Sequence, residues 1–148
     1  MRSKLILLVA VMGFISFSSL AQEYKVVTVV ESIVPGGLGR SRLIDSKEAV
    51  DYKNFTTERT NGTKSDQGDI KRGDVKIDNF GETKLLNFFS IAGINFQNIA
   101  SNDAVITSKI NDLAKEGWQL MFVTSGVESD AGKQDGEGIF ITRMIFKK

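Results

Sequence analysis

The 148-residue chain contains no cysteine and no histidine, and it has a single proline. Without cysteine it forms no disulfide, and it lacks the residue to which a bacterial lipoprotein attaches its lipid. Without histidine it lacks the commonest general base and the commonest metal ligand, so a Ser-His-Asp triad cannot form. We therefore expect no catalytic residues, no metal site and no cofactor.

The chain also has no large excess of positive or negative charge, since it contains 19 basic and 18 acidic residues. A net charge of +1 does not favour a general nucleic-acid or membrane-surface binder. Hydrophobic residues make up 41% of the chain and charged residues 25%, which is typical of a folded globular protein. The length is that of one domain.

The first 21 residues have the pattern of a signal peptide. A basic start, MRSK, precedes an apolar run over Leu5–Phe17, and small residues at positions 19 and 21 mark a cleavage site. We expect cleavage between Ala21 and Gln22, and a mature protein in the periplasm or outside the cell with no stable membrane anchor. A retained anchor is the alternative, but the apolar run is shorter than the ~20 residues that a membrane span needs.

One helix is predicted after residue 100. Ser101 is a candidate N-cap, and Asp103 would then lie near the positive end of the helix dipole. Apolar positions recur along one helix face at Ile106, Ile110 and Leu113. Gly117 is expected to end the helix in a left-handed conformation, with Trp118 packing back on Leu113. Residues 91–100 are expected to form a linker.

The remaining apolar segments predict an α+β fold, mainly an antiparallel sheet with the one principal helix packed on it. The expected strands cover residues 24–34, 40–45, 84–90, 119–125 and 139–146, with a helical turn as the alternative for 84–90. Both faces of the first strand carry valines, which predicts a central strand covered on both sides for part of its length. The last two strands should form an antiparallel hairpin, with Leu120, Phe122 and Thr124 on one face of the first of them.

Residues 22–148 are expected to form a single domain that carries a polar insertion at about 46–82. A structureless loop of this length is unusual in a compact domain, so some local structure is expected around Tyr52 and Phe55.

The first strand YKVV, a helix ending in Glu116-Gly117-Trp118 and a closing hairpin resemble the small domain-of-unknown-function family numbered forty-one seventy-seven. The similarity is best over Tyr24–Val30 and Leu113–Phe146. It implies a compact sheet-and-helix domain and no established activity. The export signal and the polar tract depart from the family pattern.

The segment GGLGRSR offers the clearest candidate binding site. Backbone N–H groups of a glycine turn can surround an anion, and arginine side chains can hold a carboxylate or phosphate. The candidate ligand-binding residues are Gly37, Gly39, Arg40 and Arg42. The alternative is a flexible turn with exposed arginines, since neither a dinucleotide fingerprint nor a P-loop is complete.

Two other groups have a chemical and a structural interpretation. The acidic residues Asp130, Asp135 and Glu137 could bind calcium, but their spacing is not that of an EF-hand, and a solvated loop is the simpler interpretation. Five aromatic residues could line an apolar pocket, although we expect them to belong to the core: Phe88, Phe89, Phe96, Trp118 and Phe122.

The sequence favours an exported, non-enzymatic module that binds a protein or a small anionic ligand. One alternative is a structural domain that forms homo-oligomers through a sheet face or edge, because its strands are apolar on two sides. A second is a histidine-free enzyme that uses two carboxylates, one of them with a raised pKa.

Overall fold

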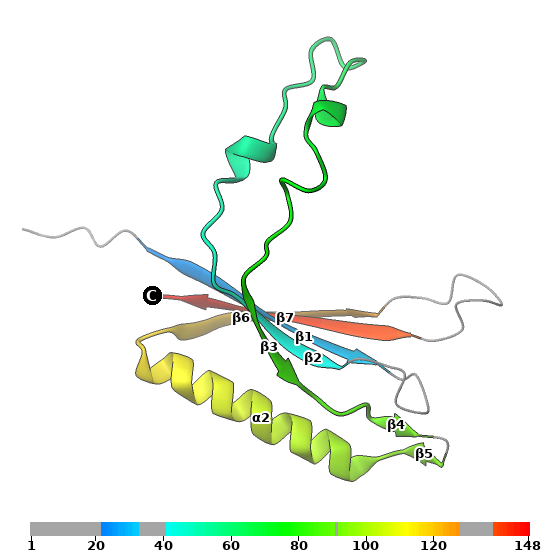
Figure 1. Cartoon of the computed structure of the whole chain (residues 1–148). Coiled ribbons are helices and arrows are strands. Elements are labelled where there is room, and N and C mark those ends of the chain that lie inside the picture. Colours follow the sequence, from blue (N-terminus) through cyan, green and yellow to red (C-terminus); the bar gives the residue numbers. More distant parts are fainter. Residues whose placement is uncertain (1–21, 33–40, 91, 128–137) are drawn as a thin grey trace, which may run out of the picture.

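The computed structural model describes residues 22–32, 41–90, 92–127 and 138–148. It contains a five-stranded sheet with one long helix against it, and a two-stranded sheet beside the helix (Figure 1). The elements are β1 Tyr24–Ser32, β2 Arg42–Ser46, 3₁₀ turns at Tyr52–Phe55 and Gln67–Asp69, β3 Phe80–Lys84, β4 Phe89–Ser90, β5 Gly93–Ile94, α2 Phe96–Lys115, β6 Gln119–Val127 and β7 Ile139–Lys147. The predicted α+β class is confirmed. The predicted signal peptide lies outside the described residues.

The sheet is antiparallel throughout, with strand order β3-β2-β1-β7-β6. The predicted central position of β1 and the hairpin of β6 with β7 are confirmed. β1 consists largely of β-branched residues, which suit a strand with neighbours on both sides. β3 and β6 form the two edges of the sheet.

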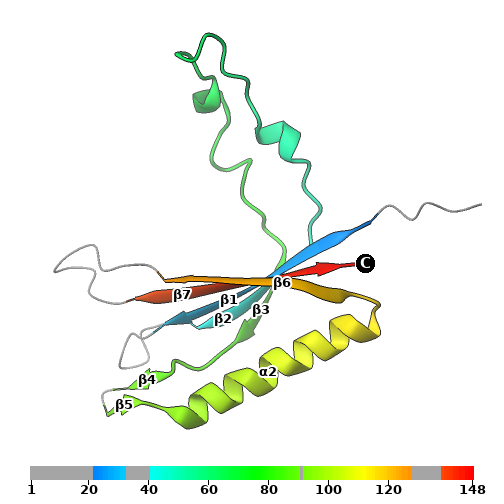
Figure 2. The same cartoon turned by 180° about the vertical axis from the view of Figure 1, so that it is seen from behind.

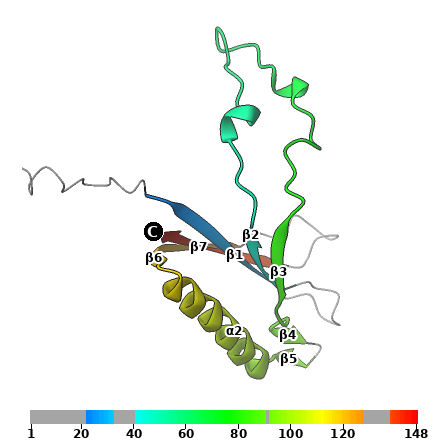
Figure 3. The ribbon, with the colours of Figure 1, turned by 60° about the vertical axis from the view of Figure 1, so that its left-hand side comes forward.

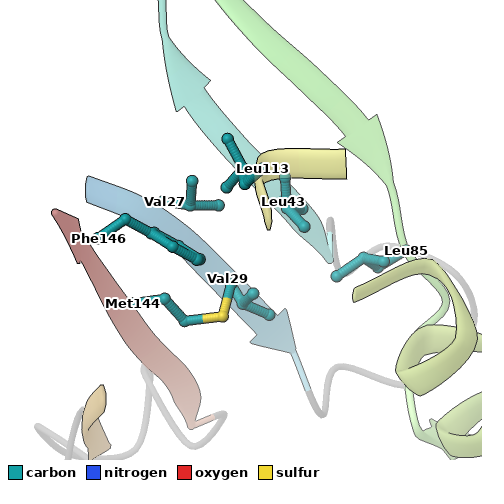
Figure 4. Packing of buried hydrophobic residues seen from close by; sticks show 7 residues of the cluster. All are labelled: Val27, Val29, Leu43, Leu85, Leu113, Met144 and Phe146. Atoms are coloured by element: carbon teal, nitrogen blue, oxygen red, sulfur yellow. The ribbon is translucent and has the colours of Figure 1, made fainter. Parts of the chain in front are cut away.

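The core lies between α2 and one face of the sheet. Its buried apolar side chains come from four strand and loop segments and from the end of the helix (Figure 4): Val27, Val29, Leu43, Leu85, Leu113, Met144 and Phe146. Val105, Ile106, Ile110 and Trp118 pack against them. The predicted apolar helix face is thus confirmed, and none of the described core residues comes from β6.

The prediction that β1 is covered on both sides for part of its length fails at Val26. Val27 and Val29 face α2 and are buried, whereas Val26 on the other face is 46% exposed. The only described segment on this side of the sheet is residues 47–79, which project away from it (Figures 1 and 2). Because the one long helix covers the opposite face, Val26 remains at the surface, while Val30 is half-buried.

The N-cap of the helix is Asn95, six residues before the predicted N-cap. Asn95 has an extended backbone, and its side chain accepts a hydrogen bond from the backbone N–H of Asn98 at 3.1 Å. Ser101 lies inside the helix, where its hydroxyl donates to the carbonyl of Gln97 at 2.9 Å. Asparagine and serine are both good N-caps, so the prediction chose the wrong one of two caps.

The predicted end of the helix is correct. Gly117 has φ +93°, and the backbone N–H of Trp118 donates to the carbonyl of Leu113 at 2.9 Å. The N–H of Gly117 donates to the carbonyl of Ala114 at 3.0 Å, which completes a Schellman motif. This stop fixes the direction in which the chain leaves α2 and enters β6.

The segment predicted as a strand at 84–90 is mostly irregular, because side chains of α2 satisfy its backbone. Asn102 is 1% exposed, and its amide oxygen accepts from the N–H of Leu86 while its amide nitrogen donates to the carbonyl of Leu86, both at 2.8 Å. The same amide nitrogen donates to Glu31 at 3.2 Å. Asn98 donates to the carbonyl of Asn87 at 2.7 Å. Side chains of α2 therefore supply hydrogen bonds to this segment that a neighbouring strand would otherwise supply.

Residues 47–79 form an arm that extends away from the sheet on the side opposite α2 (Figure 3). At its base, the N–H of Lys47 donates to the carbonyl of Asn79 at 3.4 Å, and Asn79 hydrogen-bonds to the carboxylate of Glu48. The predicted local structure around Tyr52 and Phe55 is confirmed as a 3₁₀ turn. Because the arm projects outward, it leaves the second face of the sheet uncovered.

The Schellman stop gives a first testable prediction. Alanine at position 117 would hold a Cβ in the left-handed region, so Gly117→Ala should lower the free energy of unfolding by about 1–2 kcal/mol. Gly68→Ala is the control, since a Cβ there meets no atom within 4 Å and the backbone φ is not positive. Urea denaturation monitored by circular dichroism measures both variants. Equal stability of the two would contradict the role assigned to Gly117.

Candidate interaction surface

Arg42 is the one predicted ligand-binding residue that the structure describes. Its Nε donates to Oε1 of Glu82 on β3 at 2.9 Å, and its Nη1 donates to the carbonyl of Ser41 at 2.7 Å. The guanidinium thus joins β2 to β3 on the face away from α2. Gly37, Gly39 and Arg40 lie outside the described residues, as do the calcium candidates Asp130, Asp135 and Glu137.

The described residues contain one buried charge cluster, and it lies on the helix side of the sheet. Lys109 of α2 donates to Oδ2 of Asp45 at 2.6 Å. Lys25 forms an ion pair with the other carboxylate oxygen, its Nζ lying 3.1 Å from Oδ1. Lys25 also lies over the ring of Trp118, 5.9 Å from its centre. The cluster connects β2, β1 and α2.

Burial raises the pKa of Asp45, but the hydrogen-bond and charge interactions with Lys109 and Lys25 outweigh burial and hold the pKa below its usual value. Asp45 is therefore ionised at neutral pH. A carboxylate enzyme needs a carboxyl group with a raised pKa, and Asp45 has the opposite shift. The described residues also contain no group of three or more acidic side chains placed to hold a metal ion.

The face of the sheet away from α2 has no described helix packed on it, and we call it the open face. Its residues follow from the strand register: Tyr24, Val26, Thr28 and Val30 on β1; Arg42, Ile44 and Ser46 on β2; Phe80, Glu82 and Lys84 on β3; Phe122, Thr124 and Gly126 on β6; Ile139, Ile141, Arg143, Ile145 and Lys147 on β7. Apolar side chains lie in its middle, and most of the charged ones lie toward its margins.

Two apolar rows cross the open face from strand to strand. Val26 of β1 is opposite Ile145 of β7, which is opposite Phe122 of β6. A second row runs from Val30 through Ile141 to Gly126. Contiguous apolar surface of this kind is typical of interaction sites, because isolated soluble domains rarely expose it.

A shallow hollow of about 340 Å³ lies where the second row ends at the sheet edge. It is lined by Gly126, Val127, Ile139, Ile141 and Arg143. Gly126 has no side chain, and a Cβ added there would meet nothing within 4 Å. The guanidinium of Arg143 forms no ion pair with any residue that the structure describes.

The strand β6 is exposed along its whole length. Its other face carries Leu120, Val123 and Val127, which α2 does not cover. A bulge between Leu120 and Phe122 changes the alternation, so these two residues lie on opposite faces rather than on one face as predicted. Sequence periodicity assumes a regular strand and could not reveal the bulge.

The prediction that the five aromatic residues belong to the core is wrong for three of them. Trp118 packs on the core and Phe88 is half-buried, in edge contact with Phe140. Phe89, Phe96 and Phe122 are exposed, Phe96 by 75%. The one sequence feature that could have indicated their exposure is the single predicted helix, which cannot cover every apolar strand face.

Comparison with family models, with curated proteins and with solved structures finds no match for this chain. The resemblance to the family numbered forty-one seventy-seven therefore stays a prediction. Within the described part of the chain, no helix has both the length and the hydropathy needed to cross a membrane.

The charge cluster gives a second prediction. Asp45→Asn should lower the free energy of unfolding at pH 7 by about 1.5–3 kcal/mol, because it removes charged hydrogen-bond and ion-pair partners of two lysines. The folded-state pKa of Asp45 is depressed, so its contribution is present above the unfolded pKa of about 3.9 and is lost as the pH falls through the folded value. The difference between wild type and variant should therefore shrink below about pH 4.

Urea midpoints at several pH values measure this effect. Asp112→Asn is the matched control, since Asp112 pairs with Lys115 at the exposed surface of α2 and should cost less than about 0.5 kcal/mol. If both variants had the same pH dependence, the cluster would have no special role in stability.

Proposed function

We propose that this chain is an exported, non-enzymatic binding module that recognises another protein through its open face. Export is supported by the basic start, the apolar run and the small residues before Gln22. Recognition is supported by one observation above all, the two apolar rows that cross a sheet face on which no described helix packs.

A protein partner is favoured over a small anionic ligand. The predicted anion site relied on the side chains of Arg40 and Arg42, and Arg42 is engaged by Glu82 and by the carbonyl of Ser41. The open face instead combines an apolar centre with charged residues near its margins, including Arg42, Glu82 and Lys84 on the β2 and β3 side. Protein interfaces have this arrangement of an apolar core and a polar rim. The arm beside the face adds a second, charged surface that the same partner would contact.

The export proposal predicts the N-terminus of the mature protein. Expression of the full chain in a bacterial host should give a processed envelope protein whose first residue is Gln22, measured by N-terminal sequencing. Ala21→Arg should block processing, because the residue before the cleaved bond must be small. An unprocessed wild-type chain would contradict export by a cleaved signal.

The recognition proposal predicts contact at Val26, in the centre of the first apolar row. A photo-crosslinking amino acid placed at Val26 in the producing cell should give one discrete protein adduct, identified by mass spectrometry. The same group at Asp103, exposed on α2, is the control and should give none. Val26→Lys should reduce binding of the identified partner at least tenfold, because it places a charge inside an apolar contact.

Equal adducts at Val26 and Asp103, or no adduct at Val26, would contradict recognition through the open face.

A further inference from the structure

We propose that two copies of this chain pair through β6, with Phe122 of each copy filling the hollow above Gly126 of the other. This goes beyond the proposed function, since the pairing would join two open faces into one larger surface. Four features of β6 carry the inference: its free edge, its composition, its register and the fit of its side chains.

The free edge of β6 differs from the other edge of the sheet. β3 has five residues and carries Glu82 and Lys84, whereas β6 has nine residues without a charge or a proline. Natural proteins protect edge strands with charges, prolines and short length, because unpaired backbone groups attract another strand. β3 has this protection, and beyond the bulge at Met121 β6 has none.

The exposed area of β6 is of the size that a dimer requires. Leu120, Met121, Phe122, Val123 and Val127 are each between 42% and 61% exposed. Five such side chains present roughly 500 Å² on each copy, which is a large part of the ~800 Å² per partner that standard interfaces bury. Main-chain pairing and neighbouring side chains of β7 would add the remainder.

Symmetry then restricts the register. A two-fold axis normal to the sheet pairs β6 with itself in antiparallel orientation. Directly opposed residues of an antiparallel pair lie on the same face of the sheet, so they are an even number of positions apart in β6. The midpoint of the pairing is therefore a residue, and that residue lies opposite its own copy across the axis. The strand is regular after the bulge, from Phe122 to Val127, and Thr124 is the centre that pairs Phe122 with Gly126 twice.

The pair of Phe122 with Gly126 fits in size and chemistry. A cavity of about 150 Å³ accommodates benzene, and the hollow over Gly126 has about 340 Å³. Ile139 and Ile141 give it apolar walls, and the unpaired guanidinium of Arg143 beside it would favour an aromatic ring. An aromatic side chain over a cross-strand glycine is a known way of stabilising strand pairs. Phe122, exposed by 61% in the single chain, would become buried.

The experiment uses the processed form of the full chain. Light scattering coupled to size exclusion should show a dimer at micromolar concentrations. Thr124→Cys should form a disulfide-linked dimer under mild oxidation, because paired Cα atoms lie about 4.5–5.5 Å apart, within the range of a disulfide. The chain has no other cysteine to compete. Thr83→Cys on the β3 edge is the control and should stay monomeric on a non-reducing gel.

Two further variants test the fit of Phe122 in the hollow. Gly126→Val adds a β-branched side chain where the single chain has open space, so the fold should tolerate it while the dimer dissociation constant rises at least tenfold. Phe122→Ala should raise the dissociation constant by a similar factor. The double variant should raise the dissociation constant by less than the product of the two single factors, because both substitutions remove the same contact.

A strictly monomeric wild type, or a dimer unaffected by these variants and not trapped by Thr124→Cys, would overturn the proposal. Either result would leave the recognition proposal standing if Val26 still gave its partner adduct. Loss of that adduct alone would contradict recognition and leave β6 pairing intact.

Discussion

The dependence of a five-stranded sheet on a single helix is the constraint that shapes this molecule. An amphipathic helix has one apolar face, so α2 covers part of one sheet face, and the core residues come from β1, β2, β7 and the segment at Leu85. Within the described residues, no second helix packs on the other sheet face, and β6 is exposed along its length. The surfaces to which we assign recognition and pairing are the parts of the sheet that α2 does not cover.

Polar contacts determine where the helix sits on the sheet. Asn102 binds both backbone groups of Leu86, and Lys109 binds Asp45 two turns later along α2. Apolar contacts alone would allow the helix to slide, since they are not directional. A buried amide and a buried carboxylate each require particular partners, so together they fix the position of α2 along the strands.

The elements with strong local signals could be predicted from the sequence. Gly117 and Trp118 determine the helix end by local geometry, and the β-branched residues of β1 and β7 predict strands. The helix start failed because Asn95 and Ser101 are both chemically suitable caps. The strand expected at 84–90 failed because Asn102, distant in sequence, supplies the hydrogen bonds that a strand neighbour would have supplied.

The candidate surface was less predictable than the fold. The apolar character of Phe122 and Val26 predicts that they are buried. They are exposed because one helix covers only one face of the sheet. The engagement of Arg42 depends on Glu82, forty residues away. Such long-range pairs leave no periodic trace in the sequence.

The position of Trp118 has an optical consequence. It is the chain's only tryptophan, and it lies at the junction of α2 and β6, between the ammonium groups of Lys25 and Lys148, each 5.9 Å from its ring centre. Nearby cations and partial exposure both influence indole emission. The tryptophan fluorescence of this protein therefore comes from a single site, beside the Schellman stop from which β6 leaves the helix, and a change at this site can be measured without an added label.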